Sequence, residues 1–213
     1  MKSPLIILGT GKFAEEIADY IHGSPKWSLA GFIEGVDRDK CDTEFLGRPV
    51  TWVDDTSKLS SECVAICAVG STRREEFIAR SGAAGLRFAT LVHPSAQVFA
   101  SATLSEGVIV GPGAVIGART HIGAHAIVNR GCLIGHHVDI GSYVTLGPGC
   151  NIAAKVRIGK ASYVGMGVTI IDGVEIGAAC AIGAGALVTR SLPDQVRAVG
   201  KPARVLKRGI PRV

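Results

Sequence analysis

Aliphatic residues recur every six positions through the second half of the chain. Seventeen such positions, from Val92 to Val188, follow one another without a break, and ten of them are followed directly by glycine. The residue four places after each aliphatic residue, from Ala96 to Ala186, is small or β-branched. Because alternate residues of a strand share one face, we expect this residue and the next aliphatic residue to point inward. A short fixed period of this kind predicts a β-helix.

Three such sides form one coil of a triangular prism, so that eighteen residues make one turn and the repeat holds between five and six coils. Each side ends in a three-residue corner. Glycine at the first corner position indicates a backbone conformation that a side chain would resist. An ordinary sheet with regular turns would not keep one phase over so many strands.

The first ninety residues carry a different pattern. Apolar runs predict strands over residues 4–8, 30–33 and 63–69, and the segments between them predict helices over residues 15–22 and 73–80. The alternation of strand, glycine-containing turn and helix predicts a small, Rossmann-like α/β domain with a parallel sheet.

The turn after the first strand reads GTGKFA, which has the first two glycines of a dinucleotide-binding fingerprint but alanine at the third. Ligands bind at the carboxyl ends of parallel strands, and a helix N-terminus there attracts anions such as a nucleotide diphosphate. Glu34, at the end of the second strand, is a candidate acceptor for a ribose or sugar hydroxyl. A tight structural turn and a solvated loop carboxylate are the alternative interpretations. The candidate substrate contacts are Gly9, Gly11, Lys12, Glu34, Gly70 and Ser71.

The two patterns divide the chain into an α/β domain over residues 1–90, a β-helix over residues 91–192 and a C-terminal tail over residues 193–213. The 213 residues carry a formal net charge of +5 with no basic block and only 5% aromatic residues, so nucleic-acid binding is weakly supported. A modest positive balance instead suits anionic small molecules such as nucleotide-sugars and coenzyme A.

The remaining composition argues against a membrane or extracellular protein. No apolar run reaches the roughly 18 residues of a membrane span, and the start of the chain lacks the pattern of a signal peptide. The six cysteines show neither zinc-site spacing nor a need for disulfides, so we expect a cytoplasmic location.

An α/β domain, an LVHPSA junction and hexapeptide coils form a combination that resembles the sugar O/N-acetyltransferases. This family includes the sialic acid O-acetyltransferases, the bacillosamine-pathway UDP-4-amino-sugar N-acetyltransferases and the perosamine N-acetyltransferases. The resemblance implies a left-handed parallel β-helix and a homotrimer that binds acetyl-coenzyme A between neighbouring prisms. The segments that carry it are GTGKFAEEIADYI, GFIE, AVGSTRREEF, LVHPSAQVFASATLSEGVIVGPGAVIG and VGKPARVLK.

Family members carry a histidine at the second corner position of a middle coil, seven residues after an asparagine. Asn129 and His136 match this spacing, so the resemblance implies that His136 is the general base. The acidic residue that the family often places beside this histidine is absent; His137 is adjacent, and Asp139 is the nearest carboxylate. Asp139, a carbonyl or a group from a neighbouring chain are the alternatives for orienting His136, with His137 in a supporting role. The family's second histidine contacts the acyl donor, and Thr145 occupies its position.

Acyl transfer to an amine or hydroxyl calls for a base that is active near the working pH and for N–H donors to the oxyanion. Ala118 and Ala154 lie one coil below and one coil above His136, and their small side chains leave grooves for a pantetheine arm. The VGKPAR segment resembles the tail of hexapeptide acyltransferases, which implies that Lys201 and Arg204 pair with coenzyme A phosphates. A solvated basic tail is the alternative.

The leading prediction is an acetyl-coenzyme A-dependent N-acetyltransferase that acts on a nucleotide-linked 4-amino sugar in the synthesis of a surface polysaccharide or glycan precursor. A sialic acid-type O-acetyltransferase is one alternative, because the motifs do not distinguish an amine acceptor from a hydroxyl. A non-catalytic nucleotide-sugar-binding scaffold is another, since Thr145 replaces a donor-contacting histidine. Zinc hydration of the gamma carbonic anhydrase type is disfavoured, because the spacing of His121, His125 and His136 does not match it. No metal is expected.

Overall fold

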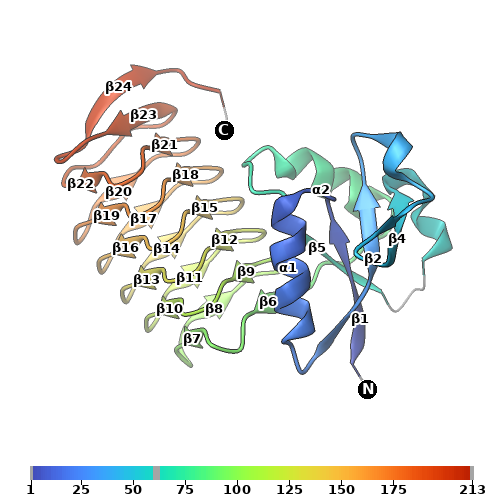
Figure 1. Cartoon of the computed structure of the whole chain (residues 1–213). Helices are drawn as coiled ribbons and strands as arrows, with labels where there is room; N and C mark the ends of the chain where they lie inside the picture. Colours follow the sequence, from blue (N-terminus) through green and yellow to red (C-terminus); the bar gives the residue numbers. More distant parts are fainter. Residues whose placement is uncertain (1, 60–62, 212–213) are drawn as a thin grey trace. The chain divides into compact units, whose positions relative to one another are not determined.

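The structure is a computed structural model that describes residues 2–59 and 63–211, and the chain forms two compact units (Figure 1). The first unit comprises Met1–Gly70 and Arg74–Leu91, and the second comprises Ser71–Arg73 and Val92–Val213. The predicted first domain and tail extend to residue 1 and to residues 212–213, which lie outside the described residues. Within the described ranges, no helix is long and apolar enough to cross a membrane.

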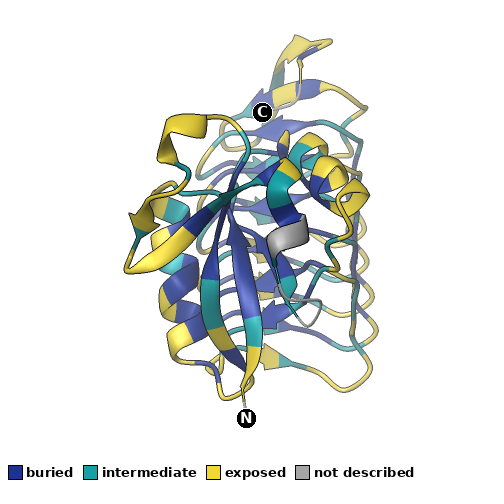
Figure 2. Cartoon of the chain, turned by 90° about the vertical axis from the view of Figure 1, so that its right-hand side faces the viewer, coloured by how far each residue is buried: buried dark blue, intermediate teal, exposed yellow. Residues whose placement is uncertain are grey.

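The first unit is built on a five-stranded sheet. Its elements are β1 (Ser3–Leu8), α1 (Lys12–His22), β2 (Trp27–Glu34), β3 (Glu44–Phe45), β4 (Arg48–Trp52), β5 (Val64–Cys67) and α2 (Arg74–Ala83), with 3₁₀ helices at Arg38–Lys40 and Val53–Lys58. The strand order is β3-β4-β2-β1-β5, in which β3 is antiparallel to β4 and the other neighbours are parallel. Helix α1 packs against β1 and β2, whose C-terminal residues are buried (Figure 2). The predicted α/β fold is confirmed.

The hairpin of β3 and β4 was not predicted from the sequence. Leu46 and Gly47 form its turn with φ values of 51° and 67°, and such positive values are typical of two-residue hairpin turns. Leu-Gly is not the usual turn pair, because leucine resists this conformation. Pro49 and the burial of Val50 alone leave β4 without an alternating pattern.

The second unit is a left-handed β-helix whose repeat strands pair in parallel with the strands eighteen residues away (Figure 1). Three sheets form its faces. The first face contains β7 (Gln97–Val98), β10 (Val115–Ile116), β13 (Leu133–Ile134), β16 (Asn151–Ile152), β19 (Thr169–Ile170) and β22 (Leu187–Val188). The second face contains β8 (Thr103–Leu104), β11 (His121–Ile122), β14 (Asp139–Ile140), β17 (Arg157–Ile158) and β20 (Glu175–Ile176). The third face contains β6 (Leu91–Val92), β9 (Ile109–Val110), β12 (Ile127–Val128), β15 (Thr145–Leu146), β18 (Tyr163–Val164), β21 (Ala181–Ile182), β23 (Val196–Val199) and β24 (Arg204–Arg208).

The predicted inward positions form the core of this prism. The aliphatic positions from Val110 to Val188 are at most 3% exposed, and the small positions from Val108 to Ala186 are at most 5% exposed. In the first coil, Val92 and the aliphatic residues that follow it are partly buried and pack against the same core. The β-helix prediction is therefore confirmed together with its register.

The reason expected for the corner glycines is wrong. Glycines at the first corner position do not have positive φ; instead, a Cβ on Gly123 would lie 2.6 Å from the backbone nitrogen of Ser142 in the next coil. Positive φ occurs at the third corner position, where glycine alternates with residues such as His125 and Ala161. Where glycine occupies the first position, as at Gly123, the close approach of the adjacent coil leaves no room for a side chain, while the third position accepts side chains.

Candidate active site

The two adjacent histidines lie at the corner between β13 on the first face and β14 on the second. His136 and His137 occupy the second and third corner positions, and both are exposed. His137 has a φ of 58°, a conformation in which histidine is enriched among non-glycine residues. Neighbouring coils hold the backbone, because the N–H of His137 donates to the Ala118 carbonyl at 2.9 Å and the N–H of Lys155 donates to the His136 carbonyl at 3.0 Å.

Thr120 braces this corner from inside the prism. Its hydroxyl donates to the carbonyl of Gly135 at 2.7 Å and accepts from the N–H of Val138 at 3.2 Å. These two bonds fix the backbone on either side of the histidines, and Thr120 is only 1% exposed. The sequence signal for this brace is a hydroxyl at an inward position that Ala, Val or Cys fills in most coils. The repeat pattern alone treats it as one more small residue.

The two imidazoles contact each other directly. Nδ1 of His136 lies 3.0 Å from Nδ1 of His137. The rings meet edge to face, with centroids 5.1 Å apart and an interplanar angle of 87°. Since a neutral imidazole carries one N–H and one lone pair, one Nδ1 donates and the other accepts.

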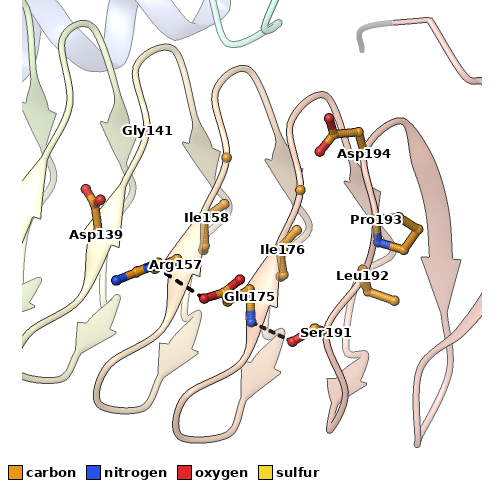
Figure 3. Close-up of a pocket in the computed structure, with 12 residues that line it drawn as sticks. Asp139, Gly141, Arg157, Ile158, Glu175, Ile176, Ser191, Leu192, Pro193 and Asp194 are labelled. Carbon is orange, nitrogen blue, oxygen red and sulfur yellow. Dashed lines mark hydrogen bonds and ion pairs between the residues drawn. The ribbon is translucent and has the colours of Figure 1, made fainter.

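Asp139 lies apart from this pair on the outer surface of the second face. It pairs in register with His121 and Arg157, and it lines a cavity of about 540 Å³ together with Glu175 (Figure 3). In that cavity Arg157 and Glu175 form an ion pair at 3.4 Å. Among the described residues, Asp139 makes no hydrogen bond to either histidine, so within this chain the structure does not bring it to the role of orienting group.

Ala118 and Ala154 flank His136 as the eighteen-residue spacing predicts, and both are partly buried. The N–H of Ala154 is already engaged, because it donates to Oδ1 of Asp172 at 2.8 Å. Asp172 occupies the same corner position one coil further along, so its carboxylate stabilises the stacking of these two coils.

Asn129 and Thr145 are committed to the solenoid. The side-chain amide of Asn129 donates to the carbonyl of Leu146 at 2.7 Å, one coil away. Thr145 is buried on β15, and its N–H donates to the carbonyl of Ser162 at 3.0 Å. Both residues therefore stabilise the stacking of coils, and their substrate and donor contacts stay predictions.

An apolar groove follows the corners between the third and first faces. Its volume is about 1000 Å³, and it is lined by Pro112, Gly113, Arg130, Gly131, Pro148, Gly149, Met166, Gly167, Ala184 and Gly185. A smaller cavity of about 300 Å³ adjoins it, with Tyr163, Met166 and Arg197 among its lining residues. None of these residues was a candidate from the sequence. The available signal was the recurrence of Gly-x-Gly at eighteen-residue intervals, as in GPG, GMG and GAG.

The basic tail forms part of the third face. β23 pairs with β21, and β24 folds back antiparallel on β23, with Arg197 opposite Lys207. Lys201 and Arg204 are both exposed, and Arg204 donates to the carbonyl of Ala203 at 3.0 Å. The segment is therefore structured, and its cationic side chains are available at the surface.

In the first unit, the carboxyl ends of β1, β2 and β5 meet at one edge of the sheet as predicted. Gly9 has a φ of 105° and donates its N–H to the carbonyl of Ile33 at 2.8 Å, and a Cβ there would lie 3.4 Å from Val69, which precedes Gly70. Gly11 is the N-cap of α1 and Lys12 is its first, exposed residue. Ser71 falls in the second unit, where its hydroxyl accepts from the N–H of Arg73 at 3.2 Å.

Glu34 is a buried, internally bonded carboxylate. Its Oε1 accepts from the N–H groups of Gly35 and Val36, each at 2.9 Å, and Oε2 accepts from the hydroxyl of Thr10 at 2.5 Å. Burial raises its pKa, but the bonds from Thr10 and the backbone outweigh burial and hold the pKa below its ordinary value. The solvated-carboxylate interpretation is wrong, because Glu34 is 5% exposed.

The two other histidines considered as metal ligands, His121 and His125, have partners of their own. His121 shares a hydrogen bond with Thr103 at 2.9 Å, and His125 stacks on Tyr143 with ring centroids 5.4 Å apart. Across the described residues, no group of three His, Cys, Asp or Glu side chains is arranged to hold a metal ion.

Comparison with known proteins places this geometry in context. Residues 155–190 match the family model described as bacterial transferase hexapeptide (six repeats). A search of curated proteins found no match. The solved structures that are similar over nearly the whole chain include those of three proteins.

One of these structures is a histidine-to-asparagine variant of perosamine N-acetyltransferase from Caulobacter crescentus in complex with coenzyme A and GDP-perosamine. It is 30% identical to this chain, the match covers 96% of this chain and 97% of that chain, and the TM-score is 0.88. The acetyltransferase domain of PglB from Neisseria gonorrhoeae, in complex with acetyl-coenzyme A, is 26% identical over 97% of this chain and 100% of its own, with a TM-score of 0.87. WeeI from Acinetobacter baumannii, 24% identical over 95% and 99% with a TM-score of 0.79, supports the fold alone.

Proposed function

Because the chain belongs to the hexapeptide-repeat sugar acetyltransferase family, we propose that it transfers an acetyl group from acetyl-coenzyme A to the amine of a nucleotide-linked 4-amino sugar. The observation that carries the proposal is the likeness, over nearly the whole of both chains, to perosamine N-acetyltransferase bound to coenzyme A and GDP-perosamine. The proposed setting is the cytoplasmic synthesis of a surface polysaccharide or glycan precursor.

In the proposed reaction the neutral acceptor amine attacks the thioester carbonyl, and the carbon–sulfur bond then breaks. The attacking nitrogen loses one proton, which His136 accepts and passes to the departing thiolate, so that the products are an amide and free coenzyme A. Exposure of the imidazole between two alanines supports this role, because both neighbours leave it accessible. In the similar Caulobacter enzyme, the variants bound to both ligands have one histidine replaced by asparagine or alanine.

Donor binding is proposed at the glycine-rich corners of the second unit. The groove beside the third face is lined mostly by apolar side chains and glycine backbone, with Arg130 as the one charged residue among the described residues that line it, and the apolar part suits an uncharged pantetheine arm. Thr145, Ala154, Lys201 and Arg204 are the proposed donor contacts, with the exposed Lys201 and Arg204 facing the phosphates. We propose a homotrimer in which neighbouring prisms share this donor.

Acceptor binding is proposed at the carboxyl edge of the first unit's sheet. The open N-terminus of α1 suits the diphosphate of a nucleotide. In the first unit the proposed contacts are Gly9, Gly11, Lys12, Glu34 and Gly70. Ser71 and Asn129 belong to the second unit and are proposed as substrate contacts of that unit. Glu34 already accepts bonds from its own chain, so its contribution is to shape the edge as well as to bind.

The test is acetyl-coenzyme A consumption, read as free thiol, against UDP-, GDP- and dTDP-4-amino sugars and free sialic acid. Turnover with one nucleotide-amino sugar, with the acetyl group located on nitrogen by mass spectrometry, is the expected result. Turnover on sialic acid alone would replace the proposal with O-acetylation. Nucleotide-sugar binding without thiol release from any acceptor would replace it with a scaffold role.

A further inference from the structure

We propose that His137 is a positioning residue that holds the Nδ1 proton of His136 and so leaves Nε2 of His136 as the basic nitrogen. This inference rests on the proposed function, in which His136 is the base. Its geometric support is the 3.0 Å contact between the two Nδ1 atoms. In an imidazole without a hydrogen-bond partner, either ring nitrogen can carry the proton, whereas an acceptor beside Nδ1 favours the tautomer with the proton on Nδ1.

Two proton arrangements satisfy this contact. In one, Nδ1–H of His136 donates to the lone pair of His137, and Nε2 of His136 is free to take a proton. In the other, Nδ1–H of His137 donates to Nδ1 of His136. The only lone pair of the neutral His136 ring is then engaged, so that His136 accepts no proton from a substrate. The reaction therefore proceeds through the first arrangement. When His136 becomes an imidazolium, its Nδ1–H still donates to a neutral His137.

Cationic side chains flank His137 along its corner of the prism. Arg119 and Lys155 occupy the same corner position in the coils below and above, and both are exposed. Two carboxylates of this region have other neighbours: Asp139 pairs in register with Arg157 on the second face, and Asp172 accepts the N–H of Ala154. Neither carboxylate bonds to the histidines within the described residues.

The fold offers matched variants at this position. Ala161 and Ala179 occupy the third corner position of other coils with φ values of 57° and 53°, so alanine is compatible with this backbone. His137→Ala therefore removes the acceptor without demanding a new backbone. His137→Asn keeps an acceptor, since Oδ1 of asparagine is attached to Cγ as Nδ1 of histidine is, and asparagine also tolerates positive φ.

The experiment compares kcat and KM for the wild type, His137→Ala, His137→Asn and the control His121→Ala. We expect His137→Ala to lower kcat about tenfold with KM unchanged, as for loss of one catalytic hydrogen bond, and His137→Asn to recover kcat to within about threefold of the wild type. His121→Ala removes an exposed histidine that bonds Thr103 and leaves kcat unchanged. Wild-type kcat in His137→Ala, or equal losses in the Ala and Asn variants, overturns the inference.

His137→Asp adds a readout that a merely structural role would not move. An anionic acceptor stabilises the imidazolium of His136, so the acid limb of the kcat/KM profile shifts to higher pH than in His137→Asn. Superimposable profiles for the two variants overturn the inference.

A second measurement separates this inference from the proposed function. NMR of isotope-labelled imidazole nitrogens reports the His136 tautomer without any turnover, with His136→Ala used to assign the signals. A proton on Nδ1 in the wild type that is lost in His137→Ala supports positioning even if no acceptor is turned over. An unchanged tautomer in His137→Ala overturns positioning even if the wild type is an active acetyltransferase.

Discussion

Glu34 ends a strand of a parallel sheet and the His136–His137 pair follows one, yet the polar groups of the two units have opposite environments. Glu34 is buried, and both its oxygens accept bonds from the loops around it. The histidines are exposed and contact each other, while the coils around them are held by backbone bonds and by Thr120. In the α/β unit a polar side chain completes an irregular frame. In the β-helix, backbone bonds between coils and a few side chains such as Thr120 hold the frame, so that His136 and His137 stay exposed at their corner.

The sharpest test of this difference is His136→Ala. Loss of a general base lowers kcat on the order of 10² to 10⁴-fold, while an exposed corner side chain contributes little to stability. Steady-state turnover with acetyl-coenzyme A should therefore collapse while the thermal unfolding curve and the donor affinity stay at the wild-type values. Full activity in this variant would remove His136 from the mechanism.

A second test changes the stacking of the coils and leaves the candidate catalytic residues unchanged. Gly123→Ala places a Cβ 2.6 Å from the Ser142 nitrogen, and Gly173→Ala adds one with no atom within 4 Å at a φ of 69°. We expect destabilisation of about 3 kcal/mol for the first and about 1 kcal/mol for the second. Denaturant unfolding followed by circular dichroism measures both. Equal losses would mean that backbone conformation, and not the approach of coils, sets the glycine requirement.

Thr120→Val tests both the frame and the candidate active site, because it removes the hydrogen bonds that hold the backbone on either side of His136 and His137. The variant keeps the shape of the side chain but leaves the Gly135 carbonyl and the Val138 N–H without this partner, which costs about 2 kcal/mol. Ser162→Ala is its matched control, since Ser162 makes the same two bonds to Gly177 and Cys180 in another coil. We expect both variants to lose stability but only Thr120→Val to lose kcat. Equal kcat values would show that the brace does not position the histidines.

Glu34→Gln tests the α/β unit alone. Replacing a charge-assisted acceptor by a neutral amide should cost about 1 to 2 kcal/mol at neutral pH. Since the folded-state pKa of Glu34 lies below the ordinary 4.5, its contribution is present above that pH and is lost as the pH falls through the folded value. The two proteins should therefore converge in stability in acid.

The measurement for Glu34→Gln is urea unfolding followed by tryptophan fluorescence. Both tryptophans of the chain, Trp27 and Trp52, belong to the first unit, so the signal reports on that unit. A gap between wild type and variant that stays constant from neutral pH to well below pH 4.5 would show that folding does not lower the pKa of Glu34.

The β-helix was predictable from sequence because one physical environment repeats every eighteen residues. This eighteen-residue repeat predicts the inward positions from Val108 onward. It also predicts the corner position of the histidines and of the alanines beside them. The reason for the first-position glycines did not follow, since the distance from Gly123 to the next coil is a property of stacking and not of local conformation.

Other features of the structure could not be predicted from the sequence pattern. The hairpin at Leu46 and Gly47 uses an unusual turn pair and leaves no alternating pattern to detect. The internal bonds of Glu34 and the contact between His136 and His137 depend on side-chain directions at loops and corners. A spacing rule names such residues but does not say whether they face a substrate, the backbone or each other.

The antiparallel return of β24 onto β23 has a consequence for solubility. A stack of parallel coils exposes unpaired backbone groups at its last strand, and a further chain adding there would extend the solenoid into a fibre. Here β24 occupies the edge of the eight-stranded sheet in the opposite direction. Arg204, Lys207 and Arg208 line that strand and are exposed. The reversed, cationic strand ends the stack and repels a second copy of the same edge.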